Sequence, residues 1–360
     1  MVKTIFHKVI KTTCDFQKAL TKLVPRFVDS LQLVEHSAKD YRELRFEDIS
    51  DEDVKRIAKL EDLTIPAIPN VSHWFRNYVV VDLARIRKTI SSMDASRDYH
   101  NFLLLCFGAI IRRCSNADPV PVSGLEVTAH MKELNKAGRV VDPFEILIQE
   151  IGKSLKAFKA FGEAVESRPR VFVERVNTAA TMSRFEHEVD AVISSPPYNN
   201  AVDYYRRHTL EMYWLGLTPT RKDRLELLHQ YIGRSRVAAG SPYLGESIED
   251  LPYCRRIHSK MSSLSPNRAN SFKHYVVAMR RSLGNLAKML RHGGKLVLVV
   301  GDSTWNDQVI RSSDVLYEVA RDDFVLSERY WYPIRNRHMS YSRHNGASIE
   351  KENVLVFVRK

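Results

Sequence analysis

The sequence predicts an α/β protein in which a mostly helical domain, residues 1–168, precedes a sheet domain, residues 169–360. In the first part, apolar residues recur three and four positions apart, as they do along one face of a helix. From about residue 170, short β-branched segments alternate with helical patterns, which is typical of a doubly wound α/β sheet. At 360 residues and 44% hydrophobic composition, the chain is long enough to form both parts.

Composition and charge narrow the classes of partner and location. The formal net charge of +12 favours a polyanionic partner, with nucleic acid first, although a generally basic surface would give the same value. No apolar run approaches the roughly 18 residues of a membrane span. The four cysteines form no CxxC pair, so we expect no metal site and no disulfide framework, and we expect a cytoplasmic location.

The helical patterns of the first domain cover four segments, residues 15–36, 50–63, 79–93 and 98–118. A further helix is predicted from Asp142-Pro143 onward. An acidic N-cap followed by a proline in the first turn is typical of a helix start, because the cap oxygen accepts from unpaired N–H groups and proline needs no partner there.

The predicted strands of the second domain are residues 170–176, 189–195, 295–303, 324–334 and 353–360. The predicted helices are residues 271–294, where one apolar stripe ends at two glycines, and residues 313–323. Strand 295–303 is nearly all apolar, as a central parallel strand is. Residues 219–270 are rich in Arg, Ser, Pro and Gly with little periodicity, so we expect a basic insertion or long loop there.

The segment AVISSPPYNN, residues 191–200, joins a strand to a stiff loop. Two consecutive prolines supply no N–H, so the strand must end there, and α/β enzymes keep their chemistry at such strand ends. The Ser195 hydroxyl and the Pro196 carbonyl are two acceptors that can hold both hydrogens of an exocyclic amine. Tyr198 offers a flat face on which a base flipped out of a duplex can stack. A simple proline turn is the alternative for these four residues alone.

The segment from Val189 to Tyr198 resembles the catalytic motif of the amino-methylating DNA methyltransferases, and residues 199–217, 289–303 and 352–360 resemble that family too. The resemblance implies a partial Rossmann-like methyltransferase sheet, its C-terminal half, with S-adenosylmethionine as cofactor and double-stranded DNA as substrate. It also implies that Ser195, Pro196, Pro197 and Tyr198 form the catalytic loop. The serine form of the motif is typical of the N4-cytosine group, whereas Asp or Asn in its place is typical of N6-adenine enzymes.

The resemblance further implies a cofactor loop, Asp-Pro-Phe-x-Gly-Ser-Gly, in which bare backbone approaches the ligand. The chain contains Asp142-Pro143-Phe144, but a helix interior without glycine comes next, and no Gly-x-Gly occurs anywhere. We therefore expect a split enzyme, in which a second methyltransferase subunit supplies the first strands and the glycine loop. A degenerate methyltransferase that binds DNA without catalysis is the alternative.

Further predictions concern contacts to the cofactor and to DNA. Asn177, Ser194 and Asp302 lie at predicted strand ends and are candidates for the cofactor pocket, with strand-end caps as the alternative. The candidates for DNA binding are arginines that lie after the loop, in the insertion and near the end of the sheet. The alternative is that these arginines are ordinary solvated surface residues. These arginines are Arg206, Arg207, Arg234, Arg236, Arg255, Arg256, Arg335, Arg337 and Arg343.

The sequence thus predicts the catalytic-loop subunit of an S-adenosylmethionine-dependent DNA methyltransferase. It would methylate N4 of cytosine by base flipping, as a heterodimer in a restriction-modification setting within the prokaryotic cytoplasm, close to the nucleoid. Two alternatives remain, an N6-adenine methyltransferase and a non-catalytic DNA-binding or regulatory subunit.

Overall fold

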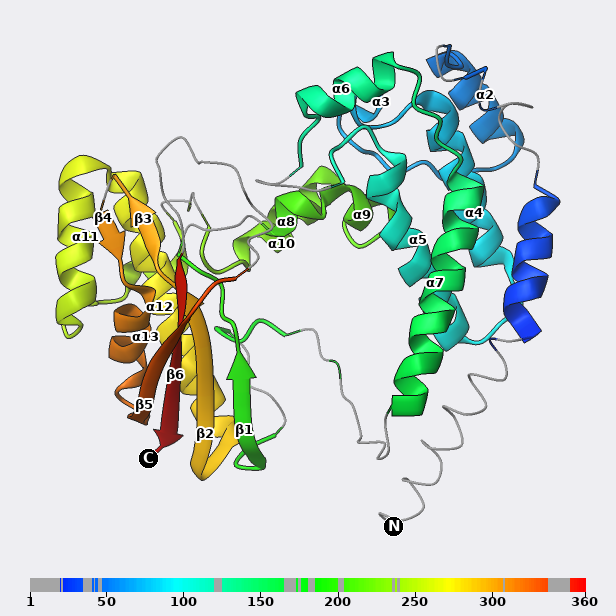
Figure 1. Ribbon diagram of the computed structural model, residues 1–360. Helices are drawn as coiled ribbons and strands as arrows, with labels where there is room; N and C mark the ends of the chain where they lie inside the picture. The colour runs from blue at the N-terminus through cyan, green and yellow to red at the C-terminus, as the bar shows by residue number, and fades with distance from the viewer. Residues whose placement is uncertain are drawn as a thin grey trace. The chain divides into compact units, whose positions relative to one another are not determined.

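The protein is described from a computed structural model, which covers most of the chain. The described residues are 20, 22–34, 41, 43–44, 47–119, 125–164, 173, 176–180, 185–199, 204–234, 237, 240–306, 308–335 and 350–360. The chain forms two units (Figure 1): unit 1 is Met1–Val173 with Tyr205–Glu226, and unit 2 is Glu174–Tyr204 with Leu227–Lys360. The division lies close to residue 168, but the stretch Tyr205–Glu226, which we assigned to the sheet domain, belongs to unit 1.

Unit 1 is helical in its described part, as expected. Residues 22–32 are helical. The later helices are α2 (Asp51–Leu60), α3 (Val71–Trp74), α4 (Asn77–Ser92), α5 (Arg97–Cys114), α6 (Ala129–Lys136), α7 (Pro143–Ala164) and α9 (Thr209–Trp214). Two more helices, α8 (Tyr204–Arg207) and α10 (Arg221–His229), each cross a boundary between the units. The predicted cap at α7 is confirmed, because Asp142 Oδ1 accepts from the N–H groups of Phe144 and Glu145, each at 3.0 Å.

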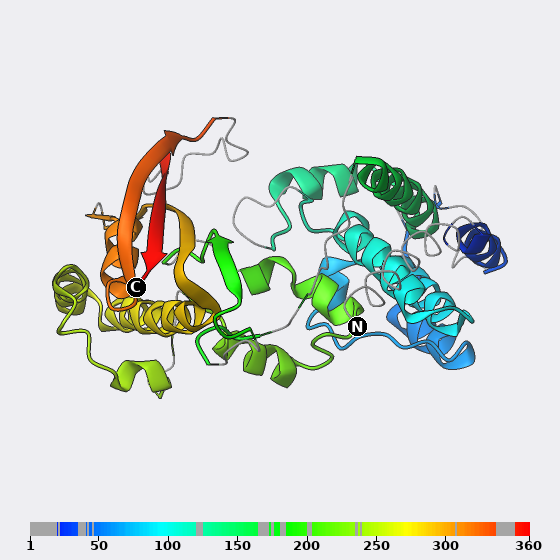
Figure 2. The ribbon, with the colours of Figure 1, turned by 90° about the horizontal axis from the view of Figure 1, so that it is seen from below.

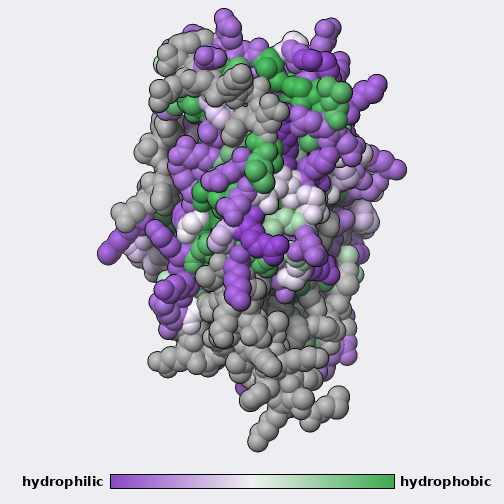
Figure 3. Space-filling model, turned by 90° about the vertical axis from the view of Figure 1, so that its right-hand side faces the viewer, coloured by the Kyte–Doolittle hydropathy of each residue, from purple (hydrophilic) through white to green (hydrophobic). Residues whose placement is uncertain are grey.

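The core of unit 1 explains why Tyr205–Glu226 joins it. Trp214, at the end of α9, is fully buried and meets the rings of Phe75 and Phe107 edge-on, with centroids 6.0 and 6.1 Å apart. A large aromatic side chain contributes more apolar burial than any other residue type, so α9 docks where its tryptophan finds a pocket. Outside this core, the side of the molecule seen in Figure 3 is mostly hydrophilic, with apolar patches between the polar side chains.

Unit 2 contains a four-stranded mixed sheet in the order β1-β2-β6-β5. Strand β1 (Val189–Ser194) pairs parallel with β2 (Leu290–Gly301), whereas β6 (Lys351–Arg359) runs antiparallel to both β2 and β5 (Phe324–Pro333). A small hairpin of β3 (Ser303–Trp305) and β4 (Gln308–Ile310) follows β2. The mixed α/β class is therefore as predicted, and the last four predicted strands are present. Of the predicted strand 170–176, Val173 and Val176 are described and lie in no strand, and the rest lies outside the described residues.

Residues 219–270 differ from the prediction of a loop. They contain α10, a short 3₁₀ helix at Pro242–Gly245, α11 (Pro252–Leu264) and the beginning of α12 (Pro266–Met289). Three of these helices begin at a proline, which fits the first turn. Buried residues of α11 recur three and four positions apart, at Cys254, Ile257 and Met261, so a narrow apolar stripe was hidden among charged residues.

The helices that pack on the sheet lie on one of its faces. In Figures 1 and 2, α12 and α13 (Ser312–Ala320) lie on the same side of the strands. Leu296, Leu298 and Val300 of β2 alternate toward these helices and are buried. The opposite face also holds β-branched residues, but Ile193 in β1 is 77% exposed there. One face of the sheet is thus well covered and the other is open at its β1 edge.

Candidate active site

The predicted catalytic loop lies at the carboxyl end of the parallel strands. Strand β1 ends at Ser194, and its parallel partner β2 ends at Gly301, so the residues that come after both strands meet at one edge of the sheet. Ser195 is exposed, Pro196 is buried, and Pro197 and Tyr198 are half-buried. The serine therefore lies at the surface, while the prolines and the tyrosine are more buried and anchor the loop.

The Tyr198 hydroxyl is held by groups from other strands. It donates to Glu352 Oε1 at 2.8 Å, although the two residues are 154 positions apart in the chain. Burial first, and then the bond to the charged Glu352, raise the pKa of Tyr198 to about 12, against smaller lowering contributions from the Gly301 backbone and the Ser195 side chain. Tyr198 therefore remains a neutral phenol at neutral pH, with one ring edge fixed.

Gly233 packs directly on the backbone of the catalytic loop. Its φ of +83° lies in the left-handed region, and a Cβ placed there would come within 2.6 Å of the Tyr198 carbonyl oxygen. Only glycine adopts this backbone without strain and allows so close an approach. Gly233 is not among the residues predicted from the sequence, because a lone glycine in a segment without periodicity looks like any loop glycine.

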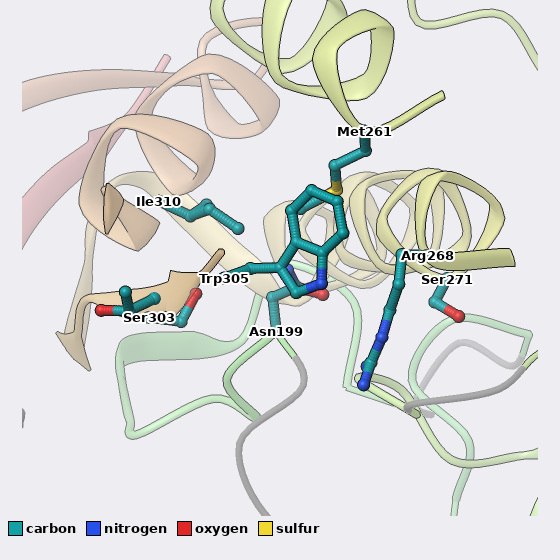
Figure 4. Close-up of a pocket in the computed structure, with 8 residues that line it drawn as sticks. Asn199, Met261, Arg268, Ser271, Ser303, Trp305 and Ile310 are labelled. Carbon is teal, nitrogen blue, oxygen red and sulfur yellow. The ribbon is translucent and has the colours of Figure 1, made fainter. Parts of the chain in front are cut away.

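Behind the loop lies a small hollow with a volume of ≈ 270 Å³, including space open to solvent. Figure 4 shows the Trp305 indole in the middle of it, with Arg268 on one side and Ile310 on the other. Asn199, the residue after Tyr198, is 4% exposed and lines the hollow. Asn199 Oδ1 and Ser303 Oγ are buried without a hydrogen-bond partner among the described residues. These two polar groups are placed to bind a water molecule, for which the enclosed part of the hollow has room.

The three candidate cofactor residues do not lie together. Ser194 ends β1, paired with Leu298, and Asp302 follows β2, so these two share the carboxyl edge with the loop. Burial raises the pKa of the Asp302 carboxyl, whose Oδ1 accepts from the Ser312 N–H at 3.1 Å. That bond caps the beginning of α13, which is the structural role that we kept as the alternative.

Asn177 lies in a turn, not at the end of a described strand. Its Oδ1 accepts from the Ala179 N–H at 3.1 Å, and the next residue, Thr178, hydrogen-bonds Ser282 and Asn285 of α12. These positions are 11 or more residues along α12 from Ser271, which lines the hollow behind the catalytic loop, a distance of about 16 Å or more at 1.5 Å per residue. The structure thus does not bring Asn177 to the catalytic loop.

Two of the candidate DNA-binding arginines lie in unit 1. Arg206 is about half exposed and forms a long ion pair with Glu126, at 3.9 Å. The carbonyl of Arg207 accepts from the buried Arg112 side chain at 3.1 Å, which fixes the backbone of α8. Both side chains are thus presented from a short helix anchored to unit 1.

The other described candidates lie in unit 2. Arg255 is exposed and pairs with Glu249 at 3.5 Å, and Arg256 lies over the Tyr253 ring at 5.3 Å. Arg234 is half-buried beside Gly233, and Arg335 is exposed just after β5. Arg236, Arg337 and Arg343 lie outside the described residues. Of this set, Arg234 is next in sequence to the glycine that contacts the catalytic loop.

Comparisons with protein-family models, with curated protein sequences and with solved structures find no match to this chain. Within the described residues, no group of His, Cys, Asp and Glu is placed to hold a metal ion, and no helix is long and apolar enough to cross a membrane. The function of the chain must therefore be inferred from the residues of the site themselves.

Proposed function

We propose that this chain is the catalytic-loop subunit of an S-adenosylmethionine-dependent DNA methyltransferase that acts on N4 of cytosine. The observation that supports it most is the Ser195–Tyr198 loop at the carboxyl end of β1, beside the end of the parallel strand β2. Open α/β sheets bind their ligands at this edge. The resemblance of the loop to the methyltransferase motif supplies the reaction, and the fold then corresponds to the C-terminal half of a Rossmann-like methyltransferase sheet.

In this proposal the loop positions one exocyclic amine. The exposed Ser195 hydroxyl and the Pro196 carbonyl accept its two N–H groups, which leaves the nitrogen lone pair free. A cytosine amine is buried in a duplex, so the base must be flipped out, and the Tyr198 ring then supplies a stacking surface. The contribution of these residues is orientation and electrostatic complementarity, without a covalent bond to the enzyme.

The residues of this chain do not make a complete S-adenosylmethionine pocket. The glycine loop is missing from the sequence, Asp302 is engaged as a helix cap, and Asn177 lies along a distant part of α12. The methyl group is therefore supplied by cofactor that a partner subunit holds with its own glycine loop. Strand β1 pairs with β2 alone among the described strands, and its Ile193 is exposed, so this edge suits pairing with a partner strand.

Two other functions remain as alternatives, and the base that is modified, or the absence of any modification, distinguishes them from N4-cytosine methylation. N6-adenine methylation would use the same loop on a different amine, and the modified base distinguishes the two. A non-catalytic DNA-binding or regulatory subunit would bind DNA through basic residues such as Arg206 and Arg234 and would leave every base unmodified.

The test is reconstitution with a partner that contains the glycine loop, which we expect a neighbouring gene to encode. We expect methyl transfer from labelled S-adenosylmethionine to DNA only when both proteins are present, with N4-methylcytosine identified by mass spectrometry. Ser195→Ala should reduce the rate by about 100-fold or more, as removal of an orienting hydrogen-bonding group does at such sites. The matched control is Ser259→Ala, an exposed serine on α11. Activity of this chain alone would rule out the split enzyme, and equal rates for the two variants would rule out the role of Ser195.

A further inference from the structure

Glu352, near the beginning of β6, lies between two tyrosines at the carboxyl edge of the sheet. Strand β6 pairs with β2 on one side and β5 on the other, which places Glu352 opposite Gly301 and opposite Tyr332. Its Oε1 accepts from the Tyr198 hydroxyl at 2.8 Å, and its Oε2 accepts from the Tyr332 hydroxyl. Both carboxylate oxygens are thus occupied by tyrosine donors from separate segments of the chain.

The hydrogen bond between Tyr198 and Glu352 has one direction. A carboxylate only accepts, so the tyrosine gives its own proton to Glu352. This bond joins the loop after β1 to β6, and it holds the hydroxyl end of the Tyr198 side chain.

We propose that Glu352 is a positioning residue for the catalytic loop: by accepting from the Tyr198 hydroxyl, it holds Tyr198 in one orientation beside the acceptors Ser195 and Pro196. This inference rests on the proposed methyl transfer. The same bond holds the hydroxyl end of Tyr198 and thereby fixes the plane of the ring on which the base would stack. Tyr332 holds the second oxygen and keeps the carboxylate oriented.

The choice of a carboxylate at this position has a physical reason. A carboxylate has acceptors only, whereas a glutamine amide can turn its NH₂ group toward the tyrosine oxygen. A glutamine has one acceptor oxygen for the two tyrosine hydroxyls that donate to Glu352, and it has no charge. Glu352→Gln therefore weakens the hydrogen bonding that holds Tyr198, with almost no change in size.

The variants Glu352→Gln, Tyr198→Phe and their combination test this inference in the full chain mixed with its partner. Tyr198→Phe keeps the ring and removes only the hydroxyl. The matched control is Glu328→Gln, which removes an equivalent charge from β5 at a residue paired with Val356 and away from the loop. Two readouts are needed: kcat and KM for DNA in methyl transfer, and the ¹⁹F NMR spectrum of chain labelled with 3-fluorotyrosine, in which Tyr198→Phe identifies the Tyr198 signal.

We expect Glu352→Gln and Tyr198→Phe each to lower kcat by about 10- to 100-fold, the effect of losing one hydrogen bond to a charged group. KM for DNA should stay within about threefold, because the stacking ring remains. The double variant should be no slower than the slower single variant, since both remove one bond. Glu352→Gln should shift the Tyr198 ¹⁹F signal, whereas Glu328→Gln should change neither readout.

Failure of this inference differs from failure of the proposed function. If the wild-type complex methylates DNA and Glu352→Gln is as fast as Glu328→Gln, or the ¹⁹F signal of Tyr198 does not move, Glu352 has no positioning role and the proposed function stands. If the wild-type complex modifies no base, the proposed function itself is wrong, and the inference falls with it.

Discussion

The polar and charged side chains of the two units lie in different surroundings. In unit 1, the fully buried Asp82 accepts from Tyr41 at 2.7 Å and from Arg85 at 3.3 Å, and Arg85 continues to Glu61. In unit 2, the polar groups around Tyr198 lie at the open edge of a sheet that described helices cover on one face. The first arrangement stabilises a closed helical core, whereas the second lies at an edge of the sheet that is partly open to solvent. Substitutions in each unit can test this contrast.

The largest expected effect is at the buried network of unit 1. Asp82→Ala removes the acceptor of Tyr41 and one partner of Arg85, and we expect it to lower the free energy of unfolding by about 3 kcal/mol. Burial alone would lower the pKa of Arg85, but its bonds to Glu61 and Asp82 raise it, which indicates that the charge depends on these partners. Hydrogen exchange of α4 peptides, read by mass spectrometry, measures the effect within unit 1.

The control for Asp82 is Glu133→Ala, which breaks the Lys136–Glu133 pair on the surface of α6. Both of its side chains are largely exposed, so we expect a loss below about 1 kcal/mol. If Asp82→Ala costs no more than Glu133→Ala, the buried network of unit 1 is not what stabilises its core, and the contrast between the units is lost.

The second prediction concerns the pH dependence of unit 2. His274 is 2% exposed, and its ring meets Tyr243 edge-on at 4.8 Å. Burial lowers the pKa of His274 from its ordinary 6.5 to about 4, with a smaller contribution from the charge of Arg234. Between these two pH values the His274 side chain is protonated in the unfolded chain but not in the folded chain. The contribution of the neutral His274 to the free energy of unfolding is therefore fully present above pH 6.5 and is lost as the pH falls toward 4.

Between pH 7 and pH 4.5 the expected loss from His274 is about 2.5 kcal/mol, at 1.36 kcal/mol for each unit of pKa. Urea unfolding at pH 7 and pH 4.5, together with hydrogen exchange of α12, measures it. Burial also lowers the pKa of His258, so wild type must be compared with His274→Gln, which cannot titrate at this position. An unchanged pH dependence in His274→Gln would show that His274 is not the group responsible.

The sequence predicts the structural elements that nearby residues determine better than the contacts that depend on segments distant in the chain. The strand before Ser195 and most of α12 result from apolar runs, which act over a few residues. The predicted end of that helix at Gly293 and Gly294 is wrong, because α12 ends at Met289 and both glycines lie in β2. The docking of Trp214 in unit 1 and the bond between Tyr198 and Glu352 depend on packing between distant segments, so no local pattern reports them. The loop of the site was therefore predictable, while the carboxylate that holds it was not.

The third prediction tests how closely the catalytic loop is packed. Gly233→Ala forces a side chain into a left-handed backbone and against the Tyr198 carbonyl, so we expect a loss of about 1–3 kcal/mol in unit 2. The control is Gly240→Ala, because a Cβ at Gly240 meets nothing within 4 Å and no positive φ is involved. Thermal unfolding and methyl transfer measured together should both be reduced in the first variant. Equal behaviour of the two variants would mean that the loop moves aside at little cost.

The smallest expected effect is at the exposed edge of unit 2. Asp190 in β1 pairs with Arg291 in β2 at 2.5 Å, with side chains 79% and 61% exposed. Solvent screens such a pair, so Asp190→Asn should lower the free energy of unfolding by less than about 1 kcal/mol, and less still in 1 M salt. Urea unfolding at low and high salt measures this difference. A cost near that of Asp82→Ala, unchanged by salt, would mean that the β1 edge is shielded from solvent and that unit 2 is not open there.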